Sequence, residues 1–104
     1  MSKMLIYIRF ILILGVHGYS SSVVVDVLIS YNLDNLTGDN SAHFYYVASN
    51  CSNTPTGASG FLINLGCSYT ATKAQYFIND AYPNYKEAYC RVYNEGWQSW
   101  QRMA

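Results

Sequence analysis

The side chains that could act as nucleophile, base or metal ligand are few and scattered along the chain. His43 precedes Cys51 by eight residues, but no third orienting group and no glycine-rich elbow accompanies them. We therefore expect His43 to be a structural residue of a strand. The acidic residues occur singly, so only folding could assemble a catalytic carboxylate pair; they are Asp26, Asp34, Asp39, Asp80, Glu87 and Glu95. The sequence predicts a protein that is not an enzyme.

The glycines and cysteines indicate no cofactor or metal site. The segment "TGASG" lacks the Lys-Ser/Thr pair that follows a phosphate-binding loop. The three cysteines, Cys51, Cys67 and Cys90, are too far apart in the chain for a CxxC pair, and their odd number does not suit a full disulfide framework. We expect small buried thiols in a reducing compartment, and one disulfide with one free thiol is the alternative. No metal and no cofactor are predicted.

Length and composition favour one small β-rich domain. A chain of 104 residues has room for a single modest core. Lysine and arginine together number six, as do aspartate and glutamate, so the balanced charge gives no footprint for nucleic acid or an anionic membrane. Aromatic residues make up 16% of the chain, with eleven tyrosines, against 12% charged residues. This balance is typical of β proteins that form interfaces or stack on ligands.

The chain opens with a hydrophobic leader. In "MSKMLIYIRFILILGVHGYSSS", Lys3 and Arg9 precede the apolar run from Phe10 to Val16, and small polar residues follow. This order predicts a signal peptide over residues 1–22, or an upstream segment that is not native to the domain. Because Arg9 interrupts a short apolar stretch, stable membrane insertion is not expected. Residues 23–30 form a connecting segment that could be a strand.

Residues 31–104 read as short strands joined by turns, which predicts an all-β fold, either a small antiparallel β-sandwich or a knob of short strands. Both faces of the strand "HFYYVAS" are apolar, so it needs cover on both sides, inside a sandwich or at a subunit contact. Further strands are expected in "FLINLGC", "KAQYFIND" and "AYCRVYN", the last with either face inward. The segment "NLDNLTGDN" predicts one helical turn or a tight loop, with Asp34 as its cap.

Both tryptophans lie near the end of the chain, in "GWQSWQRM". Residues three apart point to opposite faces of a strand but share one face of a helical turn. Because Gly96 permits a bend, we expect a strand in which one ring enters the core. The other ring of the Trp97 and Trp100 pair would then seal a subunit interface or stack on a sugar. The alternative is that both rings are packed.

The body of the chain resembles the knob domain of R-type pyocin tail fibres and related domains at the tips of phage tail fibres. The resemblance is carried by "NLDNLTG", by the strand Phe44 to Ala48, and by Asn53 to Gly60 running into Phe61 to Leu65. It ends with the segment Arg91 to Arg102, which contains a Trp-x-x-Trp element followed by a basic residue. The match covers almost everything after the leader.

The resemblance implies a β-rich knob of a virion tail fibre, assembled in the bacterial cytoplasm, that forms a homotrimer on a fibre shaft and recognises bacterial surface glycans. Side-chain chemistry suggests ligand or subunit contacts, through flat aromatic faces and hydrogen-bonding groups, at Tyr45, Arg91, Tyr93, Trp97, Gln98 and Trp100, with Asn53 beside them. The alternative is a small secreted β-rich lectin-like or structural module with a cleaved signal peptide. Neither reading involves nucleic acid.

Overall fold

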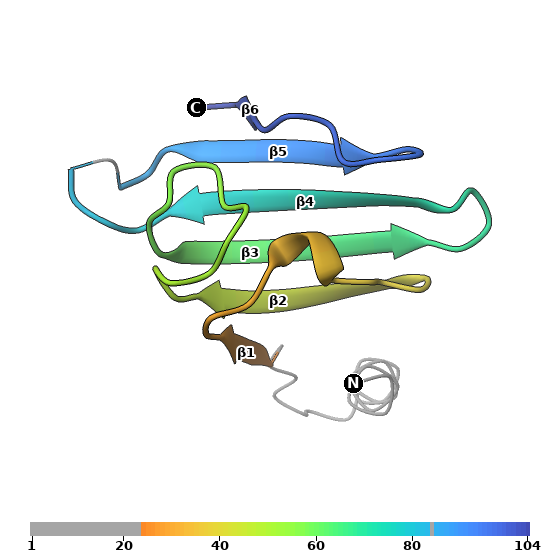
Figure 1. Ribbon diagram of the computed structural model, residues 1–104, viewed down its shortest axis with the longest axis horizontal. Coiled ribbons are helices and arrows are strands. Elements are labelled where there is room, and N and C mark those ends of the chain that lie inside the picture. Colours follow the sequence, from red (N-terminus) through yellow and green to blue (C-terminus); the bar gives the residue numbers. More distant parts are fainter. Residues whose placement is uncertain (1–23, 84) are drawn as a thin grey trace, which may run out of the picture.

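The computed structural model describes residues 24–83 and 85–104, which form one six-stranded sheet (Figure 1). Strand order in the sheet follows the order of the chain. The first two strands pair in parallel and all later pairs are antiparallel. The strands are β1 (Val25–Leu28), β2 (Ser41–Val47), β3 (Gly60–Cys67), β4 (Thr72–Asn79), β5 (Ala88–Tyr93) and β6 (Gln101–Arg102).

The prediction of a small all-β domain is confirmed. Strands form in each segment where short apolar runs indicated them, and β1 lies within the connecting segment 23–30. The described residues build a single sheet with loops on it, which corresponds to the knob of short strands rather than to a two-sheet sandwich. The predicted leader, residues 1–22, lies outside the described residues. Within the described part, no helix has the length and apolar character needed to cross a membrane.

A crossover over one face of the sheet explains the parallel pairing of β1 and β2, since parallel neighbours cannot be joined by a tight hairpin. It contains the one-turn 3₁₀ helix η2 (Leu33–Asn35), which lies in front of the sheet in Figure 1. The expected helical turn is therefore confirmed, but Asp34 as its cap was wrong. Asn32 has the extended backbone of a cap, and its side chain accepts a hydrogen bond from the Asp34 N–H at 2.9 Å.

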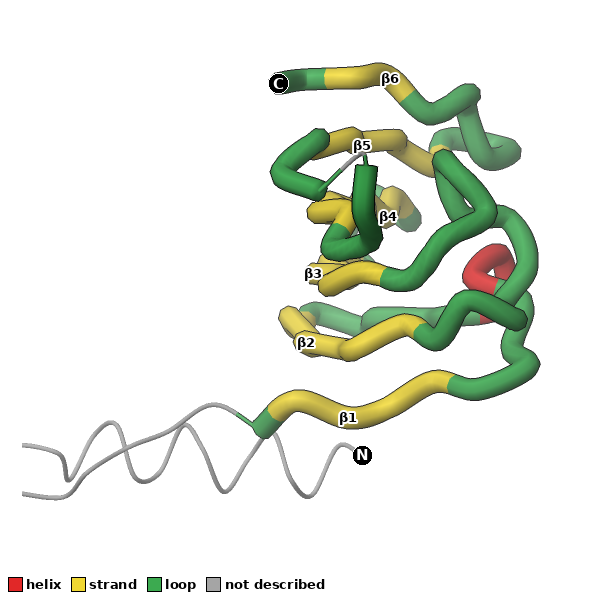
Figure 2. Tube along the Cα trace, turned by 90° about the vertical axis from the view of Figure 1, so that its left-hand side faces the viewer, coloured by secondary structure: helices red, strands yellow, loops and turns green. Residues whose placement is uncertain are grey.

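One face of the sheet carries the core. The crossover with η2 and its neighbouring loops lie on this side, as Figure 2 shows. We call this the covered face. Phe77 and Leu62 from the sheet are almost fully buried there against Leu33 from η2. The remaining core residues are Leu36, Tyr45, Val47 and Cys51, with Leu28, Tyr89 and Trp100 packed against them.

The opposite face, which we call the open face, carries the alternate residues of the same strands. Phe61 and Ile78 are neighbours in register there and remain 48% and 49% exposed. Residues Tyr89, Arg91 and Tyr93 of β5 lie on the covered face, which settles the orientation that the sequence left open. The apolar strand β2 is thus covered once, not twice, by the described residues.

Candidate functional site

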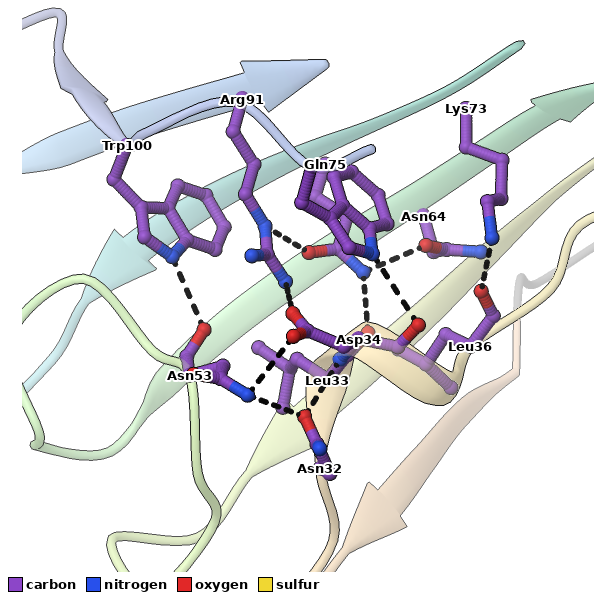
Figure 3. A network of polar contacts seen from close by, with 11 residues as sticks. Asn32, Leu33, Asp34, Leu36, Asn53, Asn64, Lys73, Gln75, Arg91 and Trp100 are labelled. Carbon is purple, nitrogen blue, oxygen red and sulfur yellow. Dashed lines mark hydrogen bonds and ion pairs between the residues drawn. The ribbon is translucent and has the colours of Figure 1, made fainter. Parts of the chain in front are cut away.

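A row of polar side chains crosses the covered face in register. His43, Asn64, Gln75 and Arg91 lie opposite one another on β2, β3, β4 and β5. Gln75 accepts a hydrogen bond from Arg91 Nε at 2.8 Å, and its Nε2 donates to Asn64 Oδ1 at 3.0 Å (Figure 3). Buried polar atoms are costly unless they are paired. The pairing of neighbouring strands therefore supplies Asn64, Gln75 and Arg91 each with a hydrogen-bond partner.

The same row fastens the crossover to the sheet. Gln75 Nε2 also donates to the carbonyl of Leu33 at 3.0 Å, and Asn64 Nδ2 donates to the carbonyl of Thr37 at 2.6 Å. Arg91 Nη2 lies 2.9 Å from Asp34 Oδ1. Burial lowers the pKa of the Arg91 guanidinium, while the hydrogen bond and charge of Asp34 oppose this shift. Asn64, Gln75 and Arg91 therefore serve the fold, whereas His43 Nε2 at the end of the row is buried without a hydrogen-bond partner among the described residues.

Both tryptophans flank the same guanidinium on the covered face. Arg91 Cζ lies 4.1 Å from the ring centre of Trp97 and 4.6 Å from that of Trp100. Trp97 Nε1 donates to the carbonyl of Asp34 at 3.2 Å, and Trp100 Nε1 donates to the carbonyl of Asn53 at 3.0 Å. The rings thus bind the end of the chain to the crossover and to the loop after β2.

The prediction that the two rings divide between opposite faces was wrong. Glu95 and Gly96 have positive φ angles of 62° and 149°, and Tyr93 pairs with Trp97 across this tight reversal. The alternation of a regular strand therefore does not extend through residues 97–100. Trp100 also packs edge-on against the core residue Phe77, with ring centres 6.2 Å apart. The alternative reading, in which both rings are packed, describes the structure.

A groove of about 320 Å³ lies beside this cluster, at the end of the sheet where β3 turns into β4. Its size is at the lower end for small-molecule sites. One wall is the segment after η2, and the other is the β3–β4 hairpin with the end of β5. The lining residues are Thr37, Gly38, Asp39, Cys67, Ser68, Ala71, Thr72, Lys73 and Tyr93.

The walls of the groove are held by hydrogen bonds between lining residues and their neighbours. Asn40 Nδ2 donates to Ser68 Oγ at 2.6 Å, and Asn40 Oδ1 accepts from the Ser68 N–H at 2.9 Å. This double contact fixes the hairpin to the loop before β2. On the hairpin, hydrogen bonds from the hydroxyl and backbone of Thr70, and from the backbone of Tyr69, lower the pKa of the exposed Cys67 thiol.

The groove combines one aromatic ring with one cation, one carboxylate and several hydroxyls. Lys73 Nζ lies 4.3 Å from the ring centre of Tyr93 and 5.4 Å from that of Trp97. Tyr93 and Trp97 meet edge to face at 5.4 Å. These contacts fix the orientation of the Tyr93 ring. Asp39 is the only carboxylate in the lining.

The predicted site residues are brought together only in part. The buried Arg91 packs against the partly buried rings of Trp97 and Trp100, and Tyr93 extends from this cluster into the groove. Asn53 donates to the side chains of Asn32 and Asp34 and supports the crossover. The two others lie apart from the groove lining: Tyr45 is buried in the core on β2, and Gln98 is exposed after the reversal.

All three cysteines are unpaired. The expectation of buried thiols is confirmed for Cys51 but was wrong for the other two, because Cys67 is exposed and Cys90 is only partly buried. Cys51 is buried, and its thiol donates to the carbonyl of Leu28 at 3.3 Å. Cys67 and Cys90 lie on different strands, well apart in register. No cluster of three or more potential metal ligands occurs in residues 24–83 and 85–104.

Sequence reasoning missed most of the groove. Lys73 and Asp39 are single charged residues in segments far apart in the chain, and only the fold brings them together. The polar row had a visible signal, because Asn64, Gln75 and Arg91 each interrupt an otherwise apolar or aromatic strand.

Comparisons of the chain with protein-family models, with curated proteins and with solved structures find no match.

Proposed function

We propose that the chain is the non-catalytic receptor-binding knob of a phage or tailocin tail fibre, and that the groove binds a bacterial surface glycan. The observation that carries this proposal is the position of Tyr93, whose ring lines the groove while Lys73 and Trp97 hold it in place. Rigid aromatic rings offer a flat apolar surface at low entropic cost. Such a surface suits the apolar face of a sugar ring.

The remaining lining supplies the polar contacts that a sugar needs. Thr37, Ser68 and Thr72 contribute hydroxyls, Asp39 accepts hydrogen bonds, and Lys73 donates them. This mixture of one stacking ring and several short polar groups is suited to hydroxyl-rich ligands. With a single carboxylate in the lining, binding without bond cleavage is the function that the groove favours.

The state of the cysteines supports assembly in the bacterial cytoplasm, which is expected of a tail-fibre component. Unpaired thiols are usual in reducing compartments, whereas small secreted domains tend to form disulfides. A homotrimer on a fibre shaft remains part of the same proposal through the resemblance to pyocin knobs.

The test is binding of the purified full chain to an array of bacterial surface polysaccharides, followed by titration calorimetry with each polysaccharide that binds. Tyr93→Ala should weaken binding about tenfold, which corresponds to a loss of about 1.4 kcal/mol of binding free energy. Tyr82→Ala is the matched control: Tyr82 is 86% exposed and lies in the β4–β5 loop, at the other end of the sheet (Figure 1).

Three results would overturn the proposal. They are no binding to any polysaccharide, loss of binding in Tyr82→Ala with full binding in Tyr93→Ala, and release of sugar fragments that Asp39→Asn abolishes. A circular dichroism spectrum of Tyr93→Ala that matches the wild type separates loss of binding from loss of fold.

A further inference from the structure

We propose that the open face of the sheet is the surface through which this chain associates with a second copy of itself. The face is built from the residues of β1 to β5 that point away from the core. In register across the sheet they are Val25, Val27, Ala42, Phe44, Tyr46, Phe61, Ile63, Leu65, Cys67, Thr72, Ala74, Tyr76, Ile78, Ala88, Cys90 and Val92. None of them carries a charge.

The exposure of these side chains is unusual for a surface that faces water. Val27 is 61% exposed, Val25 and Val92 are each 47% exposed, and Phe61 and Ile78 are close to half exposed. Single exposed apolar residues are ordinary, but a continuous apolar face marks an interaction site. On an antiparallel sheet, the face in contact with water is normally the polar one. Here the polar row lies on the covered face and the apolar side chains face outward.

The extent of the face fits a stable interface. Five strands spaced about 4.8 Å apart and six residues at about 3.3 Å each give a flat footprint of about 480 Å². The relief of the side chains makes the accessible area larger. The largest apolar patch on a typical monomer covers about 300–600 Å² and often serves binding, and a stable complex buries about 800 Å² on each partner. The flat footprint of the open face falls in the first range, and the relief of its side chains brings the accessible area toward the second.

The chemistry of the face favours an identical chain as the partner. Interfaces with transient partners are about as polar as the rest of a protein surface, whereas permanent interfaces resemble a core cut in half. The open face is of the second kind, and a permanent partner must be present whenever the chain is made. A second copy satisfies this condition, and its open face has the same twist and the same lack of charge. Two such faces can pack about 10 Å apart.

A hollow in the face offers a place for a side chain of the other copy. It measures about 160 Å³ and is lined mainly by Val25, Phe44, Phe61, Ile63, Tyr76 and Ile78. A dry apolar cavity of about this size accepts a benzene ring. An aromatic or branched side chain from the facing copy is therefore of suitable size.

The groove reaches the open face at Cys67 and Thr72, at one end of the β3–β4 pair. Phe61 and Ile78 pair at the other end of these strands and do not line the groove, so their substitution tests association separately from glycan binding. The first measurement is the mass of the full chain in solution, by light scattering at concentrations from 5 to 100 µM. We expect two or three times the monomer mass of 11.8 kDa. The variants Phe61→Lys and Ile78→Lys should shift the mass to that of the monomer. Both positions are half exposed in the single chain, so a charge there remains solvated and the monomer should keep its circular dichroism spectrum.

The matched control is Tyr82→Lys, which places the same charge at an exposed aromatic position outside the open face. It should keep the mass of the wild-type chain. A wild-type monomer at 100 µM would overturn the proposal. An assembly that Phe61→Lys and Ile78→Lys leave intact would overturn it as well, as would a polydisperse aggregate that these variants do not reduce.

A photo-crosslinking amino acid in place of Ile63, at the centre of the face, identifies the occupant directly. Crosslinks to open-face residues of another chain, found as products of twice the monomer mass, support the proposal. Crosslinks within one chain to residues 1–22 would show that the leader covers the face and would overturn it. Crosslinks to lipid or to an unrelated protein in the expressing cell, in place of crosslinks between copies, would overturn it too.

Discussion

The guanidinium of Arg91 and the carboxylate of Asp34 form an ion pair with 2.9 Å between Nη2 and Oδ1. The pair joins β5 to the η2 turn, which are separated by more than fifty residues in the chain. The side chain of Arg91 is 5% exposed and that of Asp34 is 38% exposed, so one partner is buried and the other reaches water. With Trp97 and Trp100 on its faces and Gln75 on its edge, Arg91 is the point where strand, crossover and chain end meet.

Replacing this arginine by an apolar residue of similar length should destabilise the protein. Arg91→Met leaves Gln75 Oε1 without its donor and Asp34 Oδ1 without its ion-pair partner, and removes the cation that contacts both tryptophan rings. We expect the free energy of unfolding to fall by about 2–4 kcal/mol. Urea denaturation followed by tryptophan fluorescence measures it.

Arg91→Lys is the informative companion to that variant. It keeps the charge but loses the planar stack and the fixed fork of donors, so an intermediate loss of stability is expected. If Arg91→Met were as stable as the wild type, the polar row would contribute nothing net to folding, and its role in fastening the crossover would be refuted.

The close approach of two glycines behind the groove should be equally sensitive. A Cβ built on Gly66 overlaps the backbone of Gly38, including its carbonyl carbon and oxygen. Because backbone atoms cannot move aside as a flexible side chain can, Gly66→Ala should displace the segment after η2 and cost about 2–4 kcal/mol of stability.

Gly57→Ala is the control for the glycine prediction. Gly57 has a φ of 76° but open space around its Cα, so only backbone strain of about 1 kcal/mol is expected there. Differential scanning calorimetry compares the two variants. Equal melting temperatures for them would show that the contact between Gly66 and Gly38 is not tight in solution.

The positions of the strands could be predicted from the sequence because short apolar runs and turn-forming residues alternate along it. The orientation of the strands could not. In β4 the alternate residues on the covered face are mostly polar, namely Lys73, Gln75 and Asn79 beside Phe77. Asn64 and Gln75 would ordinarily be placed on the solvent side. They lie on the covered face because strand pairing and the carbonyls of the crossover satisfy them. That compensation depends on contacts far apart in the chain.

The candidate site was predictable only where it coincides with aromatic residues. Tyr93 was identified by its residue type, whereas Asp39 and Lys73 depend on the crossover passing beside the β3–β4 hairpin. The tryptophan arrangement was missed for a local reason. The reversal at Glu95 and Gly96 ends the strand geometry, so that spacing along the chain no longer determines which side a residue faces.

Stability should fall in alkaline solution, partly through Tyr45. Burial raises the pKa of Tyr45 above its ordinary value of 10.0, with further contributions from Asp26 and Tyr31. Above about pH 10 the unfolded chain loses this proton while the folded chain keeps it, so the free energy of unfolding decreases as pH rises. In Tyr45→Phe this contribution is absent.

The expected result for Tyr45→Phe is a flatter decline of unfolding free energy between pH 9 and 11, by at most about 1.4 kcal/mol per pH unit. Urea titrations at several pH values measure it. Tyr69→Phe, which alters a ring that is 93% exposed, should keep the wild-type slope. A Tyr45→Phe variant with the wild-type slope would mean that its hydroxyl is already solvated in the folded protein.

Substitution of Trp100 tests whether the end of the chain stabilises the fold or forms the subunit contact. Trp100→Ala removes the packing on Phe77, the stack on Arg91 and the hydrogen bond to the Asn53 carbonyl. We expect the free energy of unfolding to fall by about 2–4 kcal/mol, while Trp100→Phe, which keeps a ring but loses the hydrogen bond, should cost about 1–2 kcal/mol. Urea denaturation measures both changes in the free energy of unfolding.

Because Trp100 lies on the covered face, Trp100→Ala should keep the wild-type mass in light scattering under conditions where it remains folded. A folded Trp100→Ala monomer beside an oligomeric wild type would instead place this ring at the subunit contact.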